Sequence, residues 1–201
     1  MLDFYRSLIR RHGGQSVLSV SYNDRSTQYT RFDTLVKYTV PNKTEKITLL
    51  DLGCGLGDLY DYLQTNGYQN VNYTGLDIVP EMLSAAQQNY PAAKFKNGNF
   101  VTAELENYDI ILASGSLNII FDRPDNQMQR IQNVIEKMYA SSRLACAFNL
   151  LDQDAMYLYE QDPRFYYADK RYFLQLCRSF CPQALLVDGY LINDFSLILK
   201  H

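Results

Sequence analysis

The chain has 201 residues, of which 47% are hydrophobic and 20% are charged, the balance typical of a soluble globular protein. This length suffices for one domain with a hydrophobic core and is too short for two ordinary domains. The formal net charge of −3 excludes a strongly basic protein, so charge gives no argument for nucleic acid as a partner.

The predicted elements alternate between helix and strand along most of the chain. In chain order we expect helices at 3–12 and 27–38, a strand at 47–51, a helix at 57–65, a strand at 71–77, a helix at 80–90, and strands at 93–96 and 108–113. We then expect a helix at 127–140, a strand at 143–150, an irregular aromatic segment at 152–167, a helix at 168–180, and a hairpin of strands at 184–188 and 195–200. This order predicts a single α/β domain over 1–201, built as a three-layer αβα sandwich with a mostly parallel sheet.

The four cysteines and the N-terminal sequence indicate a reducing compartment. Cys54 lies in a glycine-rich turn and Cys146 in an apolar run, so neither belongs to a disulfide framework. Cys177 and Cys181 lie on one expected helix, where they form a stripe that faces the core. No apolar stretch has the length of a signal-peptide core or of a membrane span. We therefore expect a cytoplasmic protein that does not bind membranes.

The most informative pattern is the segment 49–58, LLDLGCGLGD, in which an apolar strand runs into a glycine turn and a helix. Such a turn forms the nucleotide-binding edge of a doubly wound sheet. Dinucleotide binding usually needs G-x-G-x-x-G, but here the third glycine, Gly57, comes one position early and is followed by Asp58. Because a carboxylate repels a pyrophosphate, this turn favours a nucleotide without phosphate.

This segment resembles motif I of the class I S-adenosylmethionine (SAM)-dependent methyltransferases. Their Rossmann-like sheet has seven strands, with the last one antiparallel beside the fifth, and the expected closing hairpin fits that arrangement. The resemblance covers essentially the whole chain and is strongest to small single-domain methyltransferases in which the segments GSLN (115–118) and FNLL (148–151) recur. It implies a core over 47–201 and a helical cap over the cofactor at 1–40.

By this resemblance, loops at the carboxyl ends of the strands bind SAM. In the first loop, Gly53, Cys54, Gly55 and Gly57 pass beneath the methionine and ribose, since glycine allows close approach of the backbone. Asp51, at the end of the strand, holds the turn and the amino group of the cofactor.

The next loops hold the sugar and the base. Asp77 accepts hydrogen bonds from the ribose hydroxyls, although an aspartate at a strand end also commonly caps a helix. Ile78 and Met82 pack on the adenine. Asn99 stands where the family often has Asp, so its contact with the adenine amine is weakened, and the backbone of Phe100 meets the ring.

The fourth strand and the N-terminal segment complete the predicted cofactor site. Ser114 and Gly115 contact the methionine end of SAM, while Leu117 and Asn118 face the substrate. Tyr22, Gln28 and Arg31 are candidates to hold the SAM carboxylate, Arg31 through its forked donors. The alternative for these last residues is a solvated helix face.

The reaction needs alignment of donor and acceptor more than acid–base chemistry. The two histidines, His12 and His201, lie at the ends of the chain, so a histidine base is expected only if the cap delivers His12. Asn118, Tyr166 and Tyr167 are the candidates for catalytic roles, although both tyrosines equally fit as rings that pack a loop onto the sheet.

We expect methyl transfer to an O, N or C atom of a small molecule, with S-adenosylhomocysteine (SAH) as product, no metal, and a monomer or homodimer. Three alternatives remain open. A SAM-binding fold can perform other chemistry, such as aminopropyl transfer. The chain could also be a dinucleotide oxidoreductase, which the glycine spacing disfavours, or a SAM-binding protein that serves as an interaction partner without catalysis.

Overall fold

A computed structural model describes residues 2–21, 24–120, 126–158 and 161–201. The strands are β1 (Ile47–Leu52), β2 (Val71–Asp77), β3 (Lys94–Asn97), β4 (Tyr108–Ala113), β5 (Ser142–Asp152), β6 (Tyr167–Ala168), β7 (Leu185–Asp188) and β8 (Asp194–Lys200). The helices are α1 (Leu2–His12), α2 (Arg25–Thr39), α3 (Asp58–Thr65), α4 (Pro80–Asn89), α5 (Gln127–Ser141) and α6 (Lys170–Phe180), with short 3-10 turns η1 (Val17–Val20), η2 (Ser116–Asn118) and η4 (Gln153–Ala155).

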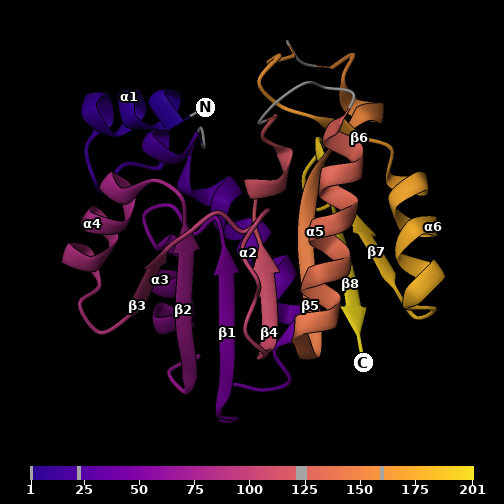
Figure 1. Ribbon diagram of the computed structural model, residues 1–201, viewed down its shortest axis with the longest axis horizontal. Coiled ribbons are helices and arrows are strands. Elements are labelled where there is room, and N and C mark those ends of the chain that lie inside the picture. Colours follow the sequence, from indigo (N-terminus) through magenta and orange to yellow (C-terminus); the bar gives the residue numbers. More distant parts are fainter. Residues whose placement is uncertain (1, 22–23, 121–125, 159–160) are drawn as a thin grey trace.

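The main sheet has the strand order β3-β2-β1-β4-β5-β8-β7 (Figure 1). Its first five strands pair in parallel, and β8 is antiparallel to both β5 and β7. The predicted Rossmann-like sheet with an antiparallel C-terminal strand is thereby confirmed. The strand order reverses between β1 and β4, and ligands of doubly wound sheets bind at that edge.

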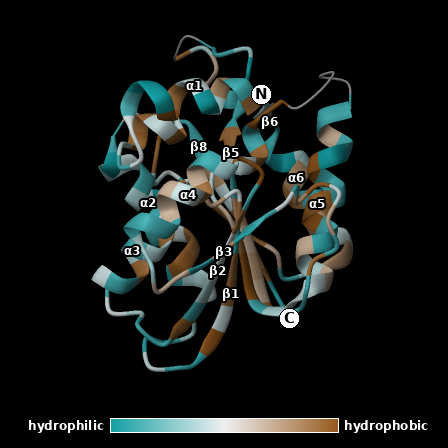
Figure 2. Cartoon of the chain, turned by 60° about the vertical axis from the view of Figure 1, so that its left-hand side comes forward, coloured by the Kyte–Doolittle hydropathy of each residue, from teal (hydrophilic) through white to brown (hydrophobic). Residues whose placement is uncertain are grey.

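The three layers follow from the alternation of side chains along the strands. Leu50 and Leu52 belong to the core cluster that contains residues of α5 and α6, whereas Ile47 and Leu49 pack with residues of α2 and α3. Figure 2 shows the sheet nearly edge-on, with α2 and α3 on one side and α5 and α6 on the other. Both faces of β1 are therefore buried, as its continuous apolar run predicts.

Local signals determine where several helices begin. Asp24 accepts a hydrogen bond from the Thr27 backbone N–H at 2.8 Å, so α2 starts at Arg25, slightly earlier than its apolar pattern predicts. Asp169 caps α6 in the same way, and Pro80 occupies the first turn of α4. Most predicted ends agree with the structure to within a few residues.

The expected irregular segment 152–167 contains structure that the sequence does not reveal. Leu151 and Asp152 pair in parallel with Tyr167 and Ala168, which form β6. A two-residue strand is too short to show periodicity, and its partner is supplied by tertiary folding.

Candidate functional site

A cavity of about 970 Å³ lies at the carboxyl ends of the parallel strands. This volume is in the range of small-molecule and cofactor sites. Of the residues predicted to hold the cofactor, those lining this cavity are Gln28, Arg31, Asp51, Gly53, Cys54, Gly55, Asp77, Ile78, Met82, Phe100, Ser114 and Gly115. Two of the catalytic candidates, Asn118 and Tyr167, line it too.

Four predicted residues, Gly57, Tyr166, Asn99 and Leu117, do not line the cavity, and Tyr22 lies outside the described residues. Leu117 is buried in the core cluster that contains residues of α5, so its predicted position facing the substrate is wrong. Gly57 has φ +80 and forms the N-cap of α3, where an added Cβ would lie 2.8 Å from the ring of Phe95. Local packing therefore requires a glycine at position 57. Tyr166 packs edge-on against Phe173, as its alternative reading predicts. Asn99 supports its own turn.

The turn that carries Phe100 is held from two directions. Asn99 Oδ1 accepts a hydrogen bond from the Val101 N–H at 3.0 Å. Lys137 Nζ donates to the carbonyls of Phe100 at 2.6 Å and Ala103 at 2.7 Å, and it also reaches the Val101 carbonyl. The amide of Asn99 thus shapes the turn, and the phenylalanine beside it reaches the cavity.

The glycine turn wraps around the carboxylate of Asp77. Gly55 N–H donates to Asp77 Oδ2 and Val79 N–H donates to Asp77 Oδ1, both at 2.9 Å. Burial raises the pKa of Asp77, while these backbone donors act in the opposite direction. Asp77 therefore holds the backbone of Val79, the residue before α4, without being the N-cap of that helix, and at the same time lines the cavity.

The end of the cavity near the glycine turn is acidic. Asp51 accepts a hydrogen bond from the Tyr73 hydroxyl at 2.8 Å, and burial raises its pKa to about 7, with the charges of Asp77 and Asp58 acting in the same direction. Asp58 stands at the start of α3, where a dinucleotide would place its pyrophosphate. This concentration of carboxyl groups favours a cationic ligand and disfavours a phosphate.

The cap residues Gln28 and Arg31 are 2% and 8% exposed, so a solvated helix face is wrong for both. Gln28 Nε2 donates to Asp58 Oδ2 at 3.0 Å, which directs its amide oxygen elsewhere. That oxygen, Gln28 Oε1, is buried and has no hydrogen-bond partner among the described residues. A buried acceptor on a cavity wall is a natural partner for a ligand N–H group.

Arg31 belongs to a buried network that the sequence did not predict. Its guanidinium forms an ion pair with Asp194, and Arg31 Nε donates to Asp194 Oδ2 at 3.0 Å. Asn149 Nδ2 donates to Asp194 Oδ1 at 2.7 Å, and Asn149 Oδ1 accepts from the Gly115 N–H at 2.9 Å. Helix α2 is thereby connected through β8 and β5 to the turn after β4. The polar Asn149 inside an apolar strand was the available signal.

The far side of the cavity carries the catalytic candidates. Asn118 Oδ1 accepts from the Leu151 N–H at 2.9 Å, so its side chain fixes backbone. The Tyr167 hydroxyl accepts from the Asp162 N–H at 3.1 Å and keeps its own proton to donate. Helix α1 brings His12 to the cavity wall. The sequence analysis expected a histidine base only if the N-terminal segment delivered His12 to the site.

Helix α1 also contributes wall residues that the sequence did not predict. Phe4, Tyr5 and Leu8 line the cavity. The guanidinium carbon of Arg164 lies 4.1 Å from the centre of the Phe4 ring, so α1 contacts the segment that precedes β6. Figure 1 shows α1 above α4, beyond the carboxyl end of β2.

A family model described as a methyltransferase domain matches residues 43–164. The chain belongs to this methyltransferase family. The matched region includes the glycine turn, the strand that ends at Asp77 and the turn after β4, so the predicted family is confirmed.

Relatives and solved structures agree with this assignment. The Mycobacterium tuberculosis protein named "Putative methyltransferase Rv1506c" is 29% identical over 167 residues, covering 80% of this chain and 97% of that protein. The magnesium protoporphyrin IX methyltransferase of Synechocystis PCC 6803, crystallised with SAH, superposes with a TM-score of 0.69 at 14% identity, covering 99% of this chain and 93% of that chain. The plantazolicin methyltransferase BpumL, in complex with a desmethyl plantazolicin analogue and SAH, superposes with a TM-score of 0.66 at 15% identity, covering 100% of this chain and 97% of that chain.

The described part of the methyltransferase holds neither a membrane-spanning helix nor a metal-binding cluster. Among the described residues, no helix combines the length and the apolar character that crossing a membrane requires. Within the same ranges, no three or more His, Cys, Asp or Glu side chains are grouped so as to hold a metal ion.

Proposed function

We propose that this methyltransferase transfers a methyl group from SAM to an O, N or C atom of a small-molecule acceptor and releases SAH. One observation carries the proposal. Three carboxyl groups and the unpartnered oxygen of Gln28 surround a glycine turn at one end of a cavity that continues beyond it. SAM offers a cation, an amino group and no phosphate, so its chemistry fits these donors and acceptors.

Each part of the cofactor has candidate residues in this arrangement. Asp77 accepts from the ribose hydroxyls with the lone pairs that its backbone donors leave free, since each carboxylate oxygen can accept more than one hydrogen bond. Ile78, Met82 and Phe100 supply the apolar contacts of the adenine. Asp51 and Gln28 Oε1 accept from the amino group.

The methionine end lies toward the cap in this proposal. Arg31 attracts the carboxylate, with Asp194 fixing the direction of its guanidinium. Ser114 and Gly115 border the sulfur side, where a turn of small residues leaves room for the acceptor. Helices α1 and α2 act as the cap that excludes water from the cavity.

When bound, SAM supplies a methyl group whose bond to sulfur breaks with both electrons remaining on sulfur. The acceptor atom supplies the electron pair for the new bond, a lone pair on O or N or the π or carbanionic pair of a C atom, and the proton it loses is taken up by bulk solvent. The protein aligns the two partners and excludes competing water, and positioning of this kind can supply roughly 7–11 kcal/mol.

Calorimetric titration with SAM, SAH and NAD tests the cofactor assignment. SAM and SAH are expected to bind with micromolar dissociation constants, and NAD is not expected to bind. Gly55→Val should abolish binding, because a Cβ at Gly55 would lie 2.7 Å from a methyl carbon of Val20. Gly67→Val is the matched control, since Gly67 also has a positive φ but does not line the cavity. Equal binding by the two variants would contradict the site.

Transfer of a labelled methyl group from SAM to a metabolite extract distinguishes methyl transfer from the other SAM-dependent alternatives. A SAM-binding protein without catalysis would leave the extract unlabelled.

We also propose a cytoplasmic location. All four cysteines are free and buried, which is the usual state of cysteines in a reducing compartment.

A further inference from the structure

The half of the cavity away from the glycine turn has a mainly apolar wall, which we call the acceptor wall. It comes from four separate segments: the end of η2, the end of β5 with η4, the approach to β6, and the loop before β8. Its apolar members are Ile119, Leu151, Met156, Phe165, Leu191 and Ile192. Ile192 is 65% exposed, so it lies at the rim of the cavity, whereas most of the others are half-buried.

The charged side chains on the acceptor wall are engaged with one another. Arg164 Nε donates to both carboxylate oxygens of Asp162, at 2.7 and 2.9 Å. This pairing lowers the pKa of Asp162, because the Arg164 guanidinium stabilises the ionised carboxylate. Asp152 Oδ2 accepts from Lys170 Nζ at 2.9 Å. Lys170 Nζ also lies 3.3 Å from Asp188 and 3.9 Å from Asp154. Within the part of the wall that the structure describes, Asp162 and Asp152 are therefore each paired with a cation, which Asp152 shares with two other carboxylates.

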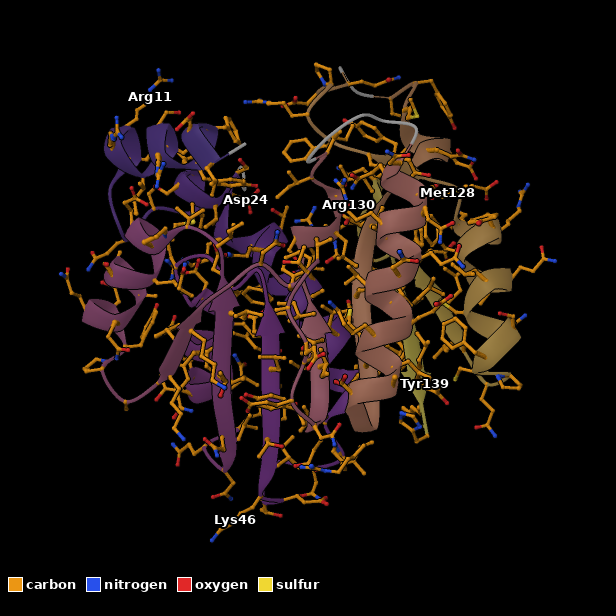
Figure 3. All side chains as sticks on the ribbon, in the orientation of Figure 1. Arg11, Asp24, Lys46, Met128, Arg130 and Tyr139 are labelled. Atoms are coloured by element: carbon orange, nitrogen blue, oxygen red, sulfur yellow. The ribbon has the colours of Figure 1, made fainter. Side chains whose placement is uncertain are left out.

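Two polar side chains of the acceptor wall also accept hydrogen bonds from the backbone. The side-chain oxygen of Asn118 is used by the Leu151 N–H, and the hydroxyl oxygen of Tyr167 is used by the Asp162 N–H. Two further arginines line the cavity outside this wall. Arg31 is paired with Asp194, and Arg11 comes from α1, where Figure 3 shows its side chain directed outward from the helix. What the described wall offers a ligand is apolar surface together with neutral polar groups: the Tyr167 O–H, the side-chain NH2 of Asn118 and the side-chain amide of Asn193.

We propose that the methyl acceptor is an uncharged, mainly apolar molecule that binds against the acceptor wall. This inference rests on the proposed function and specifies its substrate class. Among the described residues of the acceptor wall, a charged acceptor would find no counter-charge that is not already paired, so it would lose hydration without compensation, and such a loss opposes binding. An apolar acceptor instead buries its surface against side chains that are already partly exposed.

A pair of fluorescent probes tests the charge preference directly. N-phenyl-1-naphthylamine is neutral, and 8-anilinonaphthalene-1-sulfonate carries the same ring system with a sulfonate added. Both are titrated into the full chain saturated with SAH, which occupies the cofactor end. The neutral probe is expected to bind at least about tenfold more tightly, a difference of about 1.4 kcal/mol. Equal or tighter binding of the sulfonate would overturn the proposal.

Two matched variants locate the binding. Ile192→Asp places a carboxylate on the rim and should weaken binding of the neutral probe by about tenfold or more. Leu185→Asp introduces the same change on β7, at a residue that is 43% exposed and does not line the cavity, and should leave probe binding unchanged. Both residues are exposed, so neither change buries a charge in the core. Equal effects of the two variants would show that the probe binds elsewhere.

Calorimetry with SAH separates this inference from the proposed function. If the unmodified protein fails to bind SAH, the proposed function is wrong whatever the probes do. If it binds SAH and both variants retain that binding while the neutral probe shows no preference for the acceptor wall, only the substrate class is wrong.

Discussion

The buried ion pair between Arg31 and Asp194 gives a prediction whose size can be derived from the structure. The two side chains are 10% and 0% exposed, so each charge depends on the other for compensation. Removing one partner of such a pair leaves a buried charge and costs about 3–5 kcal/mol. Asp194→Asn should therefore lower the free energy of unfolding by about 3–5 kcal/mol, and Arg31→Met by a similar amount. The double variant Arg31→Met with Asp194→Leu should lose much less than the sum.

Urea unfolding followed by circular dichroism measures these free energies, with the slope m checked for a constant denatured state. Arg143→Met is the control, since Arg143 pairs with Asp109 on the surface and is 52% exposed. That pair should contribute about 0–1 kcal/mol. If Asp194→Asn costs no more than Arg143→Met, the assignment of a buried, mutually compensated pair is wrong.

The same network makes a prediction about the cofactor site. Asp194 holds Asn149, and Asn149 accepts from the Gly115 N–H in the turn after β4. Asp194→Asn should weaken SAH binding about tenfold or more under conditions where the variant is still folded. Calorimetry checks this expectation, and unchanged affinity would show that Arg31 and the turn are oriented without Asp194.

Three further predictions concern stability. Because the pKa of Asp51 is raised to about 7, the unfolded chain loses this proton near pH 4 while the folded protein keeps it. Asp51 should therefore lower the unfolding free energy by about 4 kcal/mol between about pH 4 and 7, and urea titrations should show that Asp51→Asn makes the fall smaller by about this amount, leaving the part that the raised pKa values of Asp77 and Asp58 contribute. Gly57→Ala should cost more than Gly67→Ala in thermal unfolding, because both have positive φ but only the first meets a ring at 2.8 Å. Lys137→Met leaves the carbonyls of the turn 100–103 without their donor, so urea unfolding should show a loss of about 1–3 kcal/mol, and an unchanged midpoint would contradict that role.

The sequence predicted the sheet well because its signals are local. Apolar runs mark β1 and β4, Pro80 marks the start of α4, and the glycines of the first turn mark where the backbone needs positive φ. Such requirements are met within a few residues, so they can be read along the chain. The short strand β6 escaped because its pairing with β5 is made between distant residues.

For the site, the sequence by itself predicted that the glycine turn, Asp77 and Gln28 lie together where β1 and β2 end, and residues of all three line the cavity. Only the tertiary structure decided which polar groups are shared: Asp194 reaches Arg31 from 163 positions away, and an asparagine in β5 links this pair to the turn after β4. Spacing along the chain contains no record of such partners. They are selected because a buried charge or amide must be compensated by whatever group the fold brings beside it.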